Sequence, residues 1–332
     1  MDGRRLRKKI VVLTMWCMVL TAVVIAEAVV LVVFGKKLYT EAEGWGRALH
    51  LGEMKSIEVG ENDFADRVMD NYMRYLHKAY ILFGSYPDCD YYKISDKIAR
   101  NDYDFENDFE YDDNGTTYFL YHMKDGKKAS SVAIDVSEHQ STIDWKEVKN
   151  AGVDTAIVRV GFRGYGSAGT LNKDEMYAKH MDGANKAGLK TAAYFFSEAV
   201  NYEEGVEEAK YALKLVKGHE PTEKIIVIDT EYIYNEDYAR ANDISVEERT
   251  EAIKGFCETV AAAGYKPMIY ASYGWFLRNM DLEQLADYDL WLADYDDKEY
   301  VDFPYALAGW QYSPSGSVPG VEGEVDVNVW FK

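Results

Sequence analysis

The sequence predicts an α/β fold: a modified (β/α) barrel with degenerate last units, preceded by a transmembrane helix and a spacer region. Two observations predict the barrel. From Ser131 onward, runs rich in branched and aromatic residues alternate with amphipathic runs, as do the strands and helices of a parallel sheet. These runs supply eight strand candidates, which favours a closed barrel over an open sheet. A third observation, an almost wholly apolar run over residues 10–34, predicts the membrane span.

The apolar run is long enough to cross a membrane as one helix. Residues 10–34 would form about 37 Å of helix, against a hydrocarbon core of about 30 Å. Residues 1–9 hold five basic residues and one acid. The positive-inside rule therefore predicts a cytoplasmic tail over 1–9 and puts the body outside the cell membrane. The alternative is a signal peptide cleaved near Ala26–Ala28, but the run continues through Phe34, which favours a single-pass anchor.

One acid, Glu27, lies inside the predicted span, where a charge is costly. We consider two interpretations. Glu27 contacts a partner helix within the membrane, or its side chain is protonated or reaches the interface.

Residues 35–128 are predicted to form an extracytoplasmic spacer or stalk. Apolar residues at helical spacing predict a helix over Asp63–Phe83. Residues 116–128 read as a strand, a Lys-Asp-Gly turn and a short return, which predicts a small hairpin. The region carries no pattern typical of a catalytic domain.

Composition excludes several classes of function. The net charge of the chain is -20, and because residues 1–9 carry +4, the rest carries -24. Such a body repels phosphate, so we expect no nucleic-acid partner. Cys17, Cys89 and Cys257 make no disulfide framework, although a bridge between Cys89 and Cys257 stays open. No Cys or His spacing indicates a metal site, and we expect no cofactor.

The predicted barrel domain covers residues 129–332. The expected strands are 131–136, 154–162, 190–197, 224–231, 266–272, 289–295, 306–312 and 323–330, and the expected helices are 144–152, 172–188, 203–218 and 245–264. Each of these helices ends at a glycine, as C-caps often do. The last connections are too short for full helices, which predicts the degenerate last units.

The fourth strand ends in two acids. Four branched residues, Ile225 to Ile228, indicate a strand buried on both faces. Asp229 and Glu231 then share one face, about 7 Å apart. Carboxylates this close repel each other, so one pKa should rise and that carboxyl can act as an acid. The alternative is a helix cap or a surface salt bridge at the strand end.

Polar and aromatic residues also end the other strands. In such barrels the active site lies at the carboxyl ends of the strands. The candidate acids are Asp135, Asp229, Glu231 and Asp326, and the candidate substrate-binding residues are Tyr194, Tyr270, Trp291, Tyr295, Trp310 and Gln311. Acids above an aromatic floor suit carbohydrate, and glycosidic hydrolysis needs two such carboxyl groups. Taken singly, Asp135 could be a turn former and Asp326 a surface strand residue.

An ordered set of motifs resembles glycoside hydrolase family 25, the lysozymes that act as N-acetylmuramidases. The motifs are AIDVSEHQ, AAYFFS, VIDTE, MIYAS, LWLADY and AGWQYSPSGSVPGVEGEVDVN. The resemblance covers about residues 131–332. It implies a modified barrel and cleavage, with retention, of the β-1,4 bond between N-acetylmuramic acid and N-acetylglucosamine. It also implies peptidoglycan as the partner.

The resemblance implies roles for the acids. Glu231 matches the proton donor and Asp229 the carboxylate beside it, while Asp135 and Asp326 match two further acids of the pocket. The chain departs from the family where Thr230 replaces a frequent aromatic between the two acids and where Ser141 follows Gln140. Neither departure removes a carboxylate.

Three other functions fit the same residues: a wall-binding module without turnover, a structural membrane partner, and a different glycanase of chitinase type. The intact set of acids argues against the first. The third differs in the glycan that it cleaves.

Overall fold

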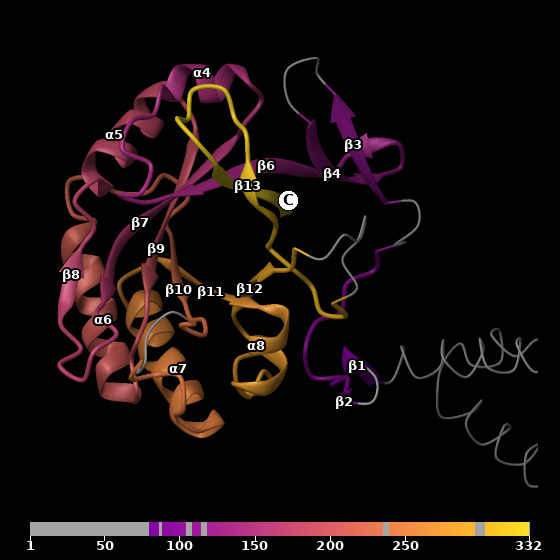
Figure 1. Ribbon diagram of the computed structural model, residues 1–332, viewed down its shortest axis with the longest axis vertical. Helices are drawn as coiled ribbons and strands as arrows, with labels where there is room; N and C mark the ends of the chain where they lie inside the picture. The colour runs from indigo at the N-terminus through magenta and orange to yellow at the C-terminus, as the bar shows by residue number, and fades with distance from the viewer. Residues whose placement is uncertain are drawn as a thin grey trace, which may run out of the picture. The chain divides into compact units, whose positions relative to one another are not determined.

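A computed structural model describes residues 80–85, 88–103, 108–113, 118–234, 239–295 and 303–331 (Figure 1). The chain divides into two compact units, residues 1–94 and residues 95–332. No helix in these described ranges is long and apolar enough to cross a membrane. The apolar run 10–34, with Glu27 and Cys17, lies outside them.

In the first unit, the described residues form a hairpin. Strand β1 (Tyr80–Ser85) pairs antiparallel with β2 (Asp88–Lys93). The helix predicted over Asp63–Phe83 therefore does not reach its expected end, and its earlier part lies outside the described residues. The reason is the run Tyr80-Ile-Leu-Phe, whose aromatic and β-branched residues favour a strand once a partner strand is present.

The second unit contains a closed eight-stranded barrel. Its strands are β6 (Ser130–Val136), β7 (Thr155–Arg163), β9 (Lys190–Phe196), β10 (Ile225–Asp229), β11 (Lys266–Ser272), β12 (Asp289–Ala293), β13 (Gly309–Gly316) and β14 (Val325–Phe331). Strand β6 pairs with both β14 and β7, which closes the ring. The short β8 (Leu171–Lys173) pairs with β7 outside the ring. The predicted barrel is confirmed.

Helices cover the outside of the barrel (Figure 1). They are α4 (Trp145–Asn150), α5 (Tyr177–Ala187), α6 (Tyr202–Leu215), α7 (Val246–Ala262) and α8 (Tyr273–Arg278). Helix α5 begins later than the predicted residue 172 because β8 occupies residues 171–173. After β11 the only helix among the described residues is the one-and-a-half-turn α8, in line with the expected degenerate last units.

The last strand runs against the others. Within the ring, all other neighbouring pairs are parallel, whereas β14 is antiparallel to both β13 and β6. The sequence predicted a parallel fold, and this strand is the exception. Its reversal brings Asp326, near the start of β14, opposite Asp135, near the end of β6.

Alternating residues fill the barrel. The buried interior cluster consists of Ala133, Ile157, Ala192, Ile225, Val227, Met268, Tyr270, Trp291, Ala293 and Trp330. Gly309 leaves room for two of these rings, since a Cβ there would lie 2.6 Å from Trp330 and 2.8 Å from Trp291. Because side chains alternate along a strand, the polar end of each strand projects above this packed interior.

The described residues between 95 and 128 (95–103, 108–113 and 118–128) pack against the barrel within the second unit. Strands β3 (Phe109–Asp113), β4 (Tyr118–Lys124) and β5 (Lys127–Lys128) form an antiparallel sheet there. The β4–β5 turn contains Asp125 and Gly126, both with positive φ. Phe109 meets Trp310 edge-on, with ring centroids 5.7 Å apart. The compact unit thus starts at Ser95, earlier than the barrel domain predicted from residue 129.

Candidate active site

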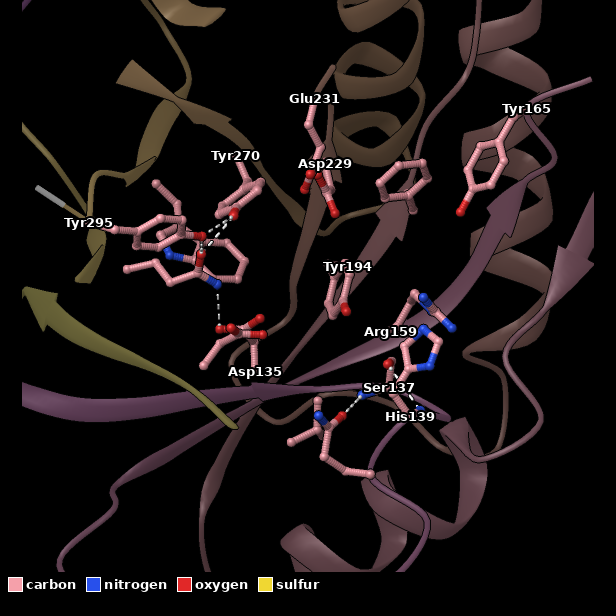
Figure 2. A pocket seen from close by; sticks show the side chains of 16 residues that line it. Asp135, Ser137, His139, Arg159, Tyr165, Tyr194, Asp229, Glu231, Tyr270 and Tyr295 are labelled. Carbon is pink, nitrogen blue, oxygen red and sulfur yellow. Dashed lines mark hydrogen bonds between the residues drawn. The ribbon is translucent and has the colours of Figure 1, made fainter. Parts of the chain in front are cut away.

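A cavity of about 360 Å³ opens at the carboxyl ends of the parallel strands (Figure 2). Nine of the ten predicted site residues line it: Asp135, Tyr194, Asp229, Glu231, Tyr270, Trp291, Tyr295, Gln311 and Asp326. They come from seven barrel strands and from the segments that follow β10 and β12. All four predicted acids therefore meet in one cavity.

Asp229 and Glu231 lie next to each other on one side of the cavity (Figure 2). Asp229 is the last residue of β10 and is 4% exposed, whereas Glu231 is half-buried. Burial, and then the charge of Glu231, raises the pKa of Asp229 well above its ordinary value. Burial also raises the pKa of Glu231. Two neighbouring carboxyls whose pKa values are both raised favour a state in which they share one proton.

Asp135 and Asp326 form a second pair of acids. They lie opposite each other on β6 and β14. Burial, and then the charge of Asp135, raises the pKa of Asp326 to about 9, so Asp326 is a neutral acid at pH 7. Burial raises the pKa of Asp135 too, but the amides of Asn328 and Gln311 donate to its Oδ2 over 2.8 and 2.9 Å and favour its charged form.

Gln311 links Asp135 to two tyrosines. Its side-chain oxygen accepts a 2.7 Å hydrogen bond from the Tyr270 hydroxyl and another from the Tyr295 hydroxyl. Its side-chain nitrogen donates to Asp135. The amide orientation is thereby fixed by all three partners, and Asp135 is held as an acceptor.

Aromatic rings form the floor between the two pairs of acids. Trp291 meets Tyr270 and Tyr194 edge-on, at centroid separations of 4.5 and 6.4 Å. The indole nitrogen of Trp291 donates to Asn328 Oδ1 over 2.8 Å, which orients the Asn328 amide toward Asp135. The floor and the second acid pair are thus one hydrogen-bonded unit.

Trp310 is not part of the cavity, and its prediction as a substrate-binding residue is not supported by its position. Its neighbours Gly309 and Gln311 face the inside of the barrel, so Trp310 faces outward. The ring is 2% exposed and packs against Phe109, and its indole nitrogen donates to the carbonyl of Asp294 over 3.0 Å.

The cavity contains residues that the sequence did not single out as site residues. They are Val136, Ser137, His139, Gln140, Arg159, Tyr165 and Phe196. Arg159 is paired with Asp174 over 2.8 Å and with Glu138 over 3.2 Å. Strand alternation could have predicted that Arg159 faces inward from β7. Its pairing with Asp174 could not be predicted, because Asp174 lies in a connection whose path the sequence does not reveal.

The arrangement is suited to acid catalysis on a polar, ring-stacked substrate. Asp229 and Glu231 both have raised pKa values, which favours a transferable proton on this pair. Asp229 Oδ1 is buried without a hydrogen-bond partner in the described part of the chain. A buried acceptor of this kind is costly unless a ligand group meets it. Among the described residues, no group of three or more His, Cys, Asp or Glu side chains is arranged to hold a metal ion.

Comparison with known proteins identifies relatives of this chain. The model of glycosyl hydrolases family 25 matches residues 134–321. The autolytic lysozyme of Clostridium acetobutylicum is 26% identical over 196 residues, which cover 59% of this chain and 54% of the relative. The lysozyme of Streptococcus phage Cp-7 is 30% identical over 196 residues, covering 56% and 51%. The chain therefore spans about half the length of these curated relatives.

Solved structures share the fold. The modular autolysin LytC from Streptococcus pneumoniae superposes with a TM-score of 0.56 and 23% identity, over 76% of this chain and 56% of that one. A family 25 glycosyl hydrolase from Bacillus anthracis gives a TM-score of 0.51 and 22% identity, over 64% and 93%. At these sequence identities, the two structures support a shared barrel fold and nothing beyond it.

Proposed function

The chain belongs to glycosyl hydrolases family 25, and from that membership we propose that it is a peptidoglycan hydrolase. The proposed reaction cleaves the β-1,4 bond between N-acetylmuramic acid and N-acetylglucosamine with retention of configuration. One observation carries the proposal: four carboxyl groups and an aromatic floor share one cavity at the carboxyl ends of the strands. Relatives described as lysozymes support it.

Glu231 is the proposed general acid. It is the more exposed member of the pair that holds a proton, so it can reach a bridging oxygen in the cavity. It gives its proton to the leaving oxygen as the glycosidic C–O bond breaks. In the second half of the reaction it takes a proton from the attacking water, which restores the starting state.

Asp229 is the proposed partner of the sugar. Once Glu231 holds the proton, Asp229 is a carboxylate with an unpartnered buried oxygen that can accept from the N-acetyl N–H group. Retention then follows by one of two routes: attack by the N-acetyl oxygen of the substrate, or direct attack by Asp229. Asp135 and Asp326, with their amide partners, would bind hydroxyl groups on the other side of the floor.

The decisive variant is Glu231→Gln, with Glu247→Gln on the exposed face of α7 as the matched control. We expect Glu231→Gln to lower turnover of purified peptidoglycan by about 10²- to 10⁴-fold, because the proton donor is lost. Thermal unfolding should be nearly unchanged, and Glu247→Gln should resemble the wild type. Near-normal lysis by Glu231→Gln would contradict the assignment.

Product analysis separates this function from its rivals. Mass spectrometry of the digest should find N-acetylmuramic acid at the new reducing end. Cleavage of chitin in preference to peptidoglycan would indicate the other glycanase. Binding of peptidoglycan by the wild type without any cleavage would indicate a wall-binding module instead.

We also propose that residues 10–34 anchor the chain in the cell membrane, with residues 1–9 in the cytoplasm and the barrel outside. The apolar length and the basic tail support this topology. The full chain should stay in the membrane fraction after an alkaline carbonate wash and leave it in detergent. A form lacking residues 1–37 should be released, and release of the full chain by carbonate would argue against the anchor.

A further inference from the structure

Glu231 lies two residues beyond the end of strand β10, so the backbone hydrogen bonds of the sheet do not fix its position. Strand β10 ends at Asp229, and the described segment from Thr230 to Tyr234 has no regular secondary structure. The last backbone bond to the neighbouring strand is from Thr230 N to Tyr270 O, over 3.1 Å. Apart from the hydrogen bond between its carboxyl group and that of Asp229, the orientation of Glu231 depends on contacts made by its neighbours in the segment.

Trp275, the third residue of α8, contacts the residues on both sides of Glu231. Its indole Nε1 donates to Thr230 Oγ1 over 3.1 Å, and both side chains are buried, at 7% and 4% exposed. Its ring meets Tyr232 edge-on, with centroids 5.9 Å apart. Thr230 precedes Glu231 and Tyr232 follows it, so a single indole ring restrains both flanks.

The indole is itself fixed from behind. The Arg249 guanidinium lies over the Trp275 ring, 4.3 Å from its centroid, and Arg249 is 2% exposed. Arg249 Nη2 donates to the carbonyls of Ala241 and Asn242, over 2.6 and 3.4 Å. The Asn242 side chain exchanges two 3.0 Å hydrogen bonds with the backbone of Ile233. The contacts thus form a closed circuit that begins and ends on the segment of Glu231.

From this circuit we infer that Trp275 is a positioning residue for Glu231, acting through its hydrogen bond to Thr230. The inference rests on the proposed role of Glu231 as general acid. Trp275 is not among the residues that line the cavity, so we assign it a role through its neighbours. It sets the direction of Glu231, and an acid misplaced by a fraction of an ångström transfers its proton poorly.

The test removes the hydrogen bond and keeps the packing. Trp275→Phe retains a ring over Arg249 and beside Tyr232 but has no N–H, and Thr230→Val replaces the hydroxyl with a methyl group. On soluble uncross-linked glycan strands we expect each to lower kcat about 10- to 100-fold, with KM changed by less than about twofold. The double variant should be no worse than the poorer single variant, because both disrupt one interaction. Thr230→Ser keeps the hydroxyl group, so it should have most of the wild-type activity that Thr230→Val loses.

Tyr177→Phe is the matched control. It removes another hydrogen bond from a buried aromatic side chain, the 2.8 Å bond from the Tyr177 hydroxyl to the carbonyl of His219, on α5 and outside the cavity. We expect its kcat to be unchanged, even if its melting temperature falls as far as that of Trp275→Phe. Equal kcat losses in Trp275→Phe and Tyr177→Phe would show a general stability effect and overturn the inference.

A second measurement does not depend on turnover. The Glu231 carboxyl carbon, followed by ¹³C NMR and assigned by its loss in Glu231→Gln, should titrate at lower pH in Trp275→Phe, because a loosened side chain becomes more hydrated. The ionisable groups that interact with Glu231 must be considered in the fit: Asp135, Glu198, Asp229, Tyr270, Tyr295 and Asp326. An unchanged titration would overturn the inference. An inactive wild type would instead contradict the proposed function while the NMR result still tests the positioning role.

Discussion

At the residue scale, the cavity contains two pairs of carboxyl groups that differ in their partners. Asp135 receives two amide N–H groups and stays the better acceptor, whereas Asp326 has the raised pKa of about 9. In the other pair, Asp229 has an unpartnered oxygen and Glu231 has access to the cavity. The same side-chain chemistry thus gives a fixed acceptor on one side and a transferable proton on the other.

The raised pKa of Asp326 predicts a dependence of stability on pH. The folded protein keeps this proton up to about pH 9, whereas the unfolded chain releases it near the ordinary value of 3.8. The contribution of Asp326 to the free energy of unfolding is therefore fully present at low pH and is lost as the pH rises through that window. One proton changes the free energy of unfolding by at most about 1.4 kcal/mol per pH unit. Because Asp326 and Asp135 titrate together, the contribution belongs to the pair.

Asp326→Asn tests that dependence, because asparagine does not titrate. We expect the variant to lose less stability than the wild type between about pH 5 and pH 8 in urea denaturation. The same substitution at the exposed Asp243 should leave the wild-type slope. An equal loss in Asp326→Asn and the wild type would show that Asp326 is already ionised in the folded protein over this range.

Most individual site residues could be predicted because strand ends and alternation are visible in the sequence. Asp229 and Glu231 follow an apolar strand, and their separation of two residues fixes a shared side. The same alternation rule argues against Trp310 as a substrate-binding residue, since its neighbour Gln311 faces the cavity and the two side chains must point to opposite sides. The contact of Trp275 with Thr230 could not be predicted, because it joins residues 45 positions apart through an interaction with no periodic signal.

At the scale of elements, helices α6 and α7 pack closely through a pair of glycines. A Cβ on Gly205 would lie 2.0 Å from the carbonyl oxygen of Ala252, and one on Gly255 would lie 2.3 Å from that of Tyr202. Both obstacles are backbone atoms, which cannot rotate away. The crossing of these two helices therefore depends on the absence of side chains at both positions.

Gly255→Ala should destabilise the fold by about 1–3 kcal/mol, because the helices must move apart to admit the methyl group. Gly166→Ala is the control, since a Cβ there meets nothing within 4 Å. Chemical denaturation of both variants measures the difference. Equal stability of Gly255→Ala and the wild type would mean that the helices are not in such close contact.

The number and order of barrel strands could be predicted, but not the direction of the last one. Branched and aromatic residues mark the eight strands of the ring in the sequence, whereas β8 was not predicted. The connection from β13 to β14 contains no helix among its described residues, and a chain without a crossover returns antiparallel. The short connection between β13 and β14 was therefore a signal for an antiparallel last strand. The regular alternation of strands and helices earlier in the chain led to the wrong expectation of a uniformly parallel sheet.

At the scale of the whole molecule, residues from Ser95 onward complete the outer surface of the barrel. Besides the contact of Phe109 with Trp310, the backbone N–H of Leu120 donates to the Tyr312 hydroxyl over 3.3 Å. Tyr103 stacks on Phe331, with centroids 5.2 Å apart. The acidic, aromatic-rich sequence there has no clear period, which is why it read as a spacer.

Residues 129–332 should accordingly be less stable than residues 95–332. Removal of residues 95–128 uncovers Trp310, and exposing one large aromatic side chain costs about 1.5–3 kcal/mol. Differential scanning calorimetry of the two fragments should show a lower melting temperature for the shorter one. Phe109→Ala in the longer fragment should lower it by part of that difference, whereas identical melting of both fragments would mean that these contacts add no stability.

The reversed last strand also determines where a reporter can be attached. Phe331 pairs with Ser130, at the end of β6 away from Asp135, while Asp326 sits at the cavity. Phe331 therefore lies at the end of the barrel opposite its mouth. A fluorophore or a surface-coupling tag attached after Phe331 would accordingly leave the entrance of the cavity clear.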